Sequence, residues 1–155
     1  AIRIATLSSS SLISKRLAST RIVLCASPGY LNKYGEPSTP ANLAEHKVIG
    51  YSYWMGGDAW EFDGPEGPVN VKIHPWMSTN NGDTCRAVAL AHQGIILQPT
   101  FLVGDDLATG RLVEILPEYR SIELGIYAVY PTRKHVAPKV RALVNFLEEK
   151  LSELD

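Results

Sequence analysis

The chain has 155 residues, enough for one ordinary domain or two small lobes, and its 45% hydrophobic and 20% charged residues are typical of a globular protein. A formal net charge of -1 gives the chain no strong electrostatic reason to hold nucleic acid by itself. The sequence has no apolar run of about 18 residues that could form a membrane span. Its cysteines, Cys25 and Cys85, are too few and too far apart for a disulfide scaffold, so a cytoplasmic location is expected.

The first half of the chain predicts short strands separated by turns. Alternating or β-rich apolar residues predict strands over these stretches: 1–5, 12–17, 22–26 and 48–51. A short helix over Tyr30–Tyr34 should be capped by Gly35, and a helical turn should begin at Pro40. The serine run at 8–11 has no periodicity and indicates a loop.

The second half alternates strands with helices. Residues 60–62 and 69–73 predict an antiparallel pair around a turn rich in glycine and proline. Three further strands are expected over 95–97, 112–116 and 124–130. Three helices are expected over 84–93, 101–108 and 138–154, the second of them capped by Gly110. This alternation predicts an α/β protein with a mixed sheet.

The helix predicted over 84–93 is the element on which the functional hypothesis depends. Asp83 is the predicted N-cap, and Gly94 is predicted to end the helix as a left-handed C-cap residue. Its apolar face is predicted from helical spacing to contain Ala87, Val88, Leu90 and Ala91. Ile95–Leu97 should follow as a short buried strand that ends at Pro99, because proline cannot donate to a strand ladder.

A polar turn precedes this helix. Backbone N–H groups at a helix N-terminus can bind a carboxylate, and Thr79, Asn80 and Asn81 add side-chain donors beside them. The alternative is that the turn only builds the helix cap, which requires the same residue types. The pattern leaves both interpretations open. If a ligand binds here, it should be small and polar or anionic.

Catalytic motifs are missing from the sequence. There is no GxSxG elbow, phosphate loop, HExxH motif or pair of CxxC motifs, and the four histidines lack metal-ligand spacing. Cys85, at a helix start, could be a reactive thiol, but a small buried residue is the favoured interpretation. The tryptophans are interpreted as packing residues. We therefore expect no enzyme activity, no cofactor and no metal site.

Several segments in a fixed order carry a family resemblance. They include the AIR strand, the CASPGYL strand–helix junction, the PANLAEH helix, NNGDTCRAVALAHQGIILQP, GRLVEILP and the ending IYAVYPTRKHVAPKVRALVNFLEEKL. In this order and spacing, which extend over nearly the whole chain, the sequence resembles the effector-binding domain of LysR-type transcriptional regulators.

The resemblance implies an α/β fold like that of a periplasmic binding protein, with two lobes joined by crossing strands and an effector in the cleft. Residues 1–21 would be a remnant of the first lobe with one crossing strand, and residues 22–124 the complete second lobe, a mixed sheet flanked by helices. Residues 125–155 would be the return strand and the C-terminal helix of the first lobe. Most of the first lobe and the DNA-reading winged helix-turn-helix would be absent, so we expect a fragment of a longer protein.

The resemblance also implies a function and a set of contact residues. It implies the sensing and oligomerising domain of a bacterial regulator, which reaches DNA only through the missing winged helix-turn-helix and contacts no membrane. The alternative is a periplasmic-type solute-binding protein with the same fold. The positions that match the family's effector contacts are Arg3, Thr79, Asn80, Asn81, Gln98 and Pro99.

The terminal helix carries an apolar stripe that would pack on the missing lobe. The stripe consists of Val140, Leu143, Val144, Leu147 and Leu151. Exposure of such side chains costs about 1.5–3 kcal/mol each. We therefore expect this chain to form a homo-oligomer through residues 138–154.

Overall fold

A computed structural model describes residues 1–6, 13–54, 56–130 and 135–153, and its contacts divide the chain into two units. Unit 1 comprises Ala1–Arg21 and Glu123–Asp155, and unit 2 comprises Ile22–Ile122. Helices alternate with strands along the chain, which confirms the predicted α/β class. The predicted serine loop lies outside the described residues.

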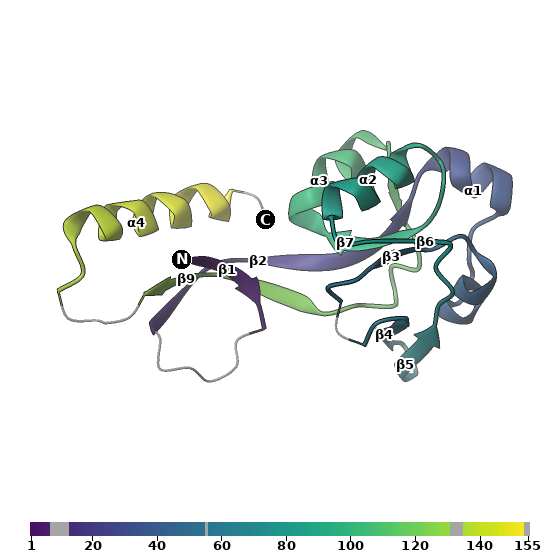
Figure 1. Cartoon of the computed structure of the whole chain (residues 1–155), viewed down its shortest axis with the longest axis horizontal. Coiled ribbons are helices and arrows are strands. Elements are labelled where there is room, and N and C mark those ends of the chain that lie inside the picture. The colour runs from purple at the N-terminus through teal and green to yellow at the C-terminus, as the bar shows by residue number, and fades with distance from the viewer. Residues whose placement is uncertain (7–12, 55, 131–134, 154–155) are drawn as a thin grey trace. The chain divides into compact units, whose positions relative to one another are not determined.

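The described residues of unit 1 form an antiparallel sheet and the helix α4 (Pro138–Ser152). Strand β9 (Glu123–Tyr130) lies between β1 (Ile2–Ala5) and the first part of β2 (Ile13–Ala26) (Figure 1). The ammonium of Lys15 on β2 forms an ion pair with the carboxylate of Glu148 on α4 at 2.6 Å. This ion pair links the helix to the sheet.

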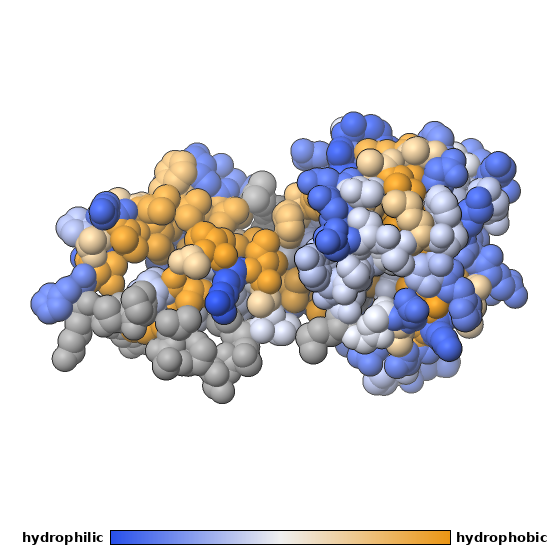
Figure 2. Space-filling model, viewed as in Figure 1, coloured by the Kyte–Doolittle hydropathy of each residue, from blue (hydrophilic) through white to orange (hydrophobic). Residues whose placement is uncertain are grey.

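The apolar stripe of α4 is largely open. No described residue of α4 is fully buried, and Leu143 and Phe146 are 56% and 54% exposed. On β1, Ile2 and Ile4 are 50% and 42% exposed. Figure 2 shows apolar side chains gathered along α4. A single copy of the chain therefore leaves this face without a partner among the described residues.

Unit 2 is built from short strands covered by helices. The second part of β2 pairs antiparallel with β7 and β8, β3 pairs parallel with β6, and β4 and β5 form a hairpin. The remaining elements have these bounds: α1 Pro28–Tyr34, η1 Pro40–Glu45, β3 Ile49–Tyr51, β4 Ala59–Gly64, β5 Gly67–Lys72, β6 Met77–Thr79, α2 Gly82–Leu90, β7 Ile96–Pro99, α3 Thr100–Thr109 and β8 Val113–Glu114. The parallel pair β3–β6 is a two-stranded sheet of its own, and an isolated parallel bridge between Val48 and Ile95 links it to the antiparallel strand β7, so the unit contains both kinds of pairing.

The core of unit 2 lies where α2 and α3 meet the strands. Its buried cluster comprises Val23, Cys25, Ile49, Cys85, Ala89, Ile96, Val103 and Leu112. Two residues of α2, Cys85 and Ala89, enter this core, whereas Ala87 and Ala91, which were predicted for the apolar face, are exposed. Val88 and Leu90 of the predicted face pack against the cluster, so the prediction was right for these two residues and wrong for the two alanines.

Both predicted caps of α2 are wrong. The helix starts at Gly82, and its N-cap is Asn81, whose Oδ1 accepts a hydrogen bond from the backbone N–H of Thr84 at 3.1 Å. Asp83 instead lies in the first turn. At the other end the cap is Ala91, and the left-handed residue is His92, with φ 64°. Gly94 does not cap the helix. A glycine is needed at this position because a Cβ would lie 2.8 Å from the carbonyl oxygen of Lys47.

Three strand predictions also change. The stretches predicted over 12–17 and 22–26 fall on one continuous strand, β2 (Ile13–Ala26), with residue 12 outside the described residues and a register shift between Arg16 and Ala18. The strand predicted over 112–116 shortens to β8. Pro99 is the last residue of β7, opposite Ile22, so the predicted end of that strand is confirmed. Gly35 and Gly110 also follow α1 and α3 with φ of 84° and 75°, as predicted.

Candidate functional site

The polar turn between β6 and α2 is held by short local hydrogen bonds. The backbone N–H of Asn81 donates to Oγ1 of Thr79 at 3.2 Å, and Oδ1 of Asn81 caps α2 through Thr84. The carbonyl of Thr79 accepts from the backbone N–H of Ser52 at 3.0 Å, which ties the turn to the end of β3. Asn80 and Asn81 are exposed, so their side-chain amides are accessible to a ligand.

The N-terminus of α2 has opposing electrostatic features. The backbone N–H groups of a first helical turn carry partial positive charge and favour an anion. Asp83 places a carboxylate in that same turn and is exposed. An anion at this end would therefore be favoured on the side of Asn80 and Asn81 and repelled beside Asp83.

Gln98 lies beneath the first turn of α2. Its Oε1 is 3.1 Å from the position that a Cβ on Gly82 would take, so Gly82 allows the helix to start directly over the carboxamide. Gln98 is 2% exposed, and among the described residues Nε2 finds no hydrogen-bond partner. An unpaired buried amide is costly. Trp60 Nε1 and Gln98 Nε2 are the buried side-chain atoms without a partner in the described part of the chain, and Gln98 is the one that lies at the start of α2.

Cys85 also lies at this end of α2 but behaves as a core residue. The side chain is completely buried, and burial raises the pKa of its thiol to about 11. The smaller opposing effects of its own backbone and of Gln98 do not offset that increase. The thiol is therefore protonated near neutral pH, which agrees with the favoured interpretation of a small buried residue.

The predicted contact residues fall into two groups. Thr79, Asn80, Asn81 and Gln98 are brought together in unit 2 around the start of α2, and buried Pro99 serves as the N-cap of α3. Arg3 belongs to unit 1, where it is exposed and lies opposite Tyr127 on β9.

The sequence analysis missed a buried ionic cluster between α2 and α3. Asp106 is 0% exposed, and its carboxylate accepts hydrogen bonds from Nε and Nη2 of Arg86 at 2.5 and 2.9 Å. Nη2 of Arg111 lies 2.9 Å from the same carboxylate. The sequence does contain a signal, because Asp106 follows buried Val103 at helical spacing. A charged residue at a core position indicates a partner that local patterns do not identify.

Two of the four histidines have structural partners. The ring Nδ1 of His46 lies 2.7 Å from the Tyr30 hydroxyl, and the ring Nδ1 of His92 lies 2.7 Å from the Ser27 hydroxyl. Trp60 is a core residue as expected, but Trp76 is 50% exposed. Across the residues that the structure describes, no cluster of side chains suits a metal ion, and no helix is long and apolar enough to cross a membrane.

Comparison with known proteins extends over almost the whole chain. Residues 1–152 match the LysR substrate binding domain family. An uncharacterized HTH-type transcriptional regulator of Haemophilus influenzae is 35% identical over 147 residues, which are 94% of this chain and 51% of that protein. The regulator DmlR of Escherichia coli is 33% identical over 144 residues, 92% of this chain and 46% of DmlR. The chain thus spans about half the length of the curated relatives it matches.

Solved structures agree with the sequence comparison. The regulatory domain of CrgA, a LysR-type transcriptional regulator from Neisseria meningitidis, superimposes with a TM-score of 0.84 at 32% identity, over 97% of this chain and 74% of that chain. The regulatory domain of AphB in Vibrio vulnificus gives 0.78 at 26% identity, over 94% and 72%. Both comparisons confirm the resemblance and the periplasmic-binding-protein-like fold class. The chain belongs to the LysR substrate-binding domain family.

Proposed function

We propose that this chain is the effector-sensing part of a LysR-type transcriptional regulator that works in the bacterial cytoplasm without catalysing a reaction. The observation that carries the proposal is the family match over residues 1–152. The named relatives are transcriptional regulators, which favours this role over the alternative of a periplasmic-type solute-binding protein. DNA contact would come from a winged helix-turn-helix in the longer protein.

The proposed effector site is the polar turn and the first turn of α2. Support comes from the accessible amides of Asn80 and Asn81, from the hydroxyl of Thr79 and from the helix N-terminus. Gln98 would hold the first turn from below or turn its unpaired Nε2 toward a ligand. On the family's pattern, Pro99 is a further proposed contact in unit 2. Donors predominate here, so the effector would be a small polar or anionic molecule.

Asn81→Ala tests the site, because it removes both the cap and the side-chain amide. We expect the affinity for an effector to fall about tenfold, as for the loss of a hydrogen bond to a charged group. Losing the cap should lower the free energy of unfolding by about 1 kcal/mol. A thermal-shift screen of small carboxylates and amides supplies the binder, and titration calorimetry measures its Kd with each variant.

Asn81→Ser is the matched control. Serine caps a helix about as well as asparagine but provides no amide donor. If Asn81 contacts the effector, both variants bind weakly while the serine variant keeps its stability. Full affinity in the serine variant, with only stability lost in the alanine variant, would show that the turn is merely a cap.

The isolated chain should not bind duplex DNA specifically. Its formal net charge is -1, and specific binding depends strongly on neutralising phosphates. Fluorescence anisotropy with a labelled promoter duplex at about 0.15 M salt should show no saturable change with this chain, whereas the longer regulator should bind. If the chain alone bound one promoter sequence more tightly than a scrambled one, it would contradict the proposal that only the winged helix-turn-helix reads DNA.

A further inference from the structure

Unit 1 contains a cavity that the proposed effector site does not use. Its volume is about 390 Å³, and it lies among the start of β2, the end of β9 and the first turns of α4. Pockets that hold small organic molecules start at about 300 Å³. The cavity is therefore large enough for a compact ligand.

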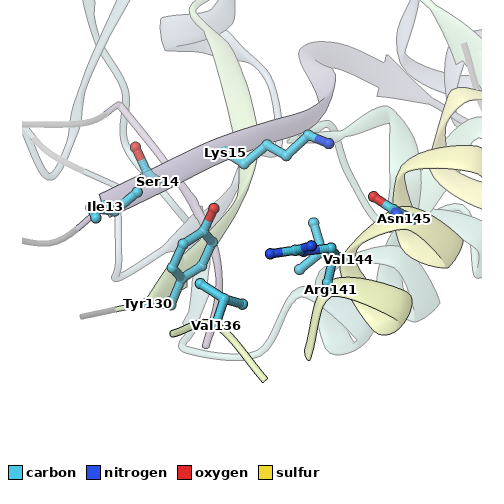
Figure 3. A pocket seen from close by; sticks show the side chains of 8 residues that line it. All are labelled: Ile13, Ser14, Lys15, Tyr130, Val136, Arg141, Val144 and Asn145. Atoms are coloured by element: carbon cyan, nitrogen blue, oxygen red, sulfur yellow. The ribbon is translucent and has the colours of Figure 1, made fainter. Parts of the chain in front are cut away.

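The walls of the cavity combine apolar surface with donors. Ile13, Val136 and Val144 contribute apolar side chains. Figure 3 shows Arg141 reaching from α4 toward the ring of Tyr130, with Asn145 one turn further along the helix. Such a wall is amphipathic: it can cover a hydrocarbon body and bind a polar head group.

The two cations of the cavity differ in their partners. Lys15 lines the cavity, but its ammonium is already 2.6 Å from the carboxylate of Glu148. Arg141 is exposed and has no ion-pair partner among the residues that the structure describes. Its guanidinium is therefore available, and it presents paired donors in the geometry that a carboxylate accepts.

We propose that this cavity binds a small amphipathic carboxylate, with the carboxylate on the guanidinium of Arg141 and the apolar body against Val136 and Val144. The hydroxyl of Tyr130 and the amide of Asn145 supply further donors. Lys15 is paired with Glu148, so its ammonium does not contact the ligand. The negative charge of Glu148 therefore limits the affinity for the carboxylate. The cavity shares no residue with the polar turn before α2, so the two proposals can be tested separately.

A fluorinated carboxylate and its amide test this proposal on the 155-residue chain. The probe is 3-(4-fluorophenyl)propionate, with binding followed by ¹⁹F NMR line broadening, and 3-(4-fluorophenyl)propionamide is the uncharged control. Arg141→Gln should weaken binding of the acid about tenfold. Glu148→Gln should strengthen it several-fold, because it releases Lys15. The amide should bind weakly to every variant.

Two further variants locate the signal. Lys139→Gln removes a cation from the same helix without touching the cavity, and Asn81→Ala removes the capping amide of the polar turn. Neither should change the affinity for the acid. Circular dichroism melts confirm that all four variants fold. The proposal is overturned if Arg141→Gln and Lys139→Gln weaken binding of the acid equally, or if only Asn81→Ala weakens it. It is also overturned if the acid and the amide bind equally well, or if the acid does not bind at millimolar concentration.

Discussion

Replacing Asp106 with alanine is expected to lower the free energy of unfolding by about 3 kcal/mol. The carboxylate is completely buried and holds the guanidinium groups of Arg86 and Arg111, so its removal leaves two cationic side chains facing a void. The loss should fall at the lower end of the usual range, because those side chains are 32% and 55% exposed and can turn toward water. Since the cluster joins α2 to α3, the start of α2 should loosen as well.

Chemical denaturation followed by tryptophan fluorescence measures this loss. The matched control is Asp105→Ala, which removes the neighbouring carboxylate from the exposed side of the same helix. It should change stability by no more than about 0.5 kcal/mol. Equal effects of the two substitutions would mean that the ionic cluster adds nothing beyond ordinary helix charge.

In solution this chain should be a dimer or a higher oligomer. On α4, Leu143 and Phe146 are more than half exposed and no described residue is buried, while Ile2 and Ile4 on β1 add further open apolar surface. Covering each large side chain is worth about 1.5–3 kcal/mol. A patch of this kind on a monomer would promote association. A second copy that presents the same helix is the simplest partner, because closed symmetric pairs are the commonest oligomers.

Light scattering at micromolar concentration decides the assembly state. The parent should scatter as at least twice its chain mass of 17.0 kDa, and a Leu143→Asp, Leu147→Asp double variant should scatter as a monomer. Ser152→Asp adds a charge elsewhere on α4 and should leave the oligomer intact. If the parent is a clean monomer and the double variant is equally stable, α4 is neither an interface nor part of a core.

Local chemistry predicted most elements of the fold but not their ends. Gly35 and Gly110 follow helices with positive φ, because a helix commonly ends where a residue without a Cβ can take positive φ. Gly94 looks the same in sequence, yet what it meets is the carbonyl of Lys47, a contact with a distant part of the chain. The same limit applied to Asp83, since only the backbone path shows that Asn81 is the residue that turns into α2.

In the candidate site, too, the sequence predicted the local features but not the contacts between distant segments. The residue types of the polar turn pointed to a helix start with donors beside it, and the structure has both. Burial of Gln98 with an unpaired amide could not be read from its neighbours, because it depends on α2 lying over β7. The cavity beside Arg141 was also missed, since its walls come from strands and a helix more than a hundred residues apart in the chain.

The sequence by itself determined the α/β class, the order of the elements and the family, because these depend on periodicity, turn residues and the spacing of segments along the chain. Only the tertiary structure decided which side chains lost contact with water. It joined two predicted stretches into β2, whose second part pairs with β7 opposite Pro99, and it buried Asp106 between two arginines. Pairing and burial depend on partners far away in sequence, and no local pattern specifies those partners.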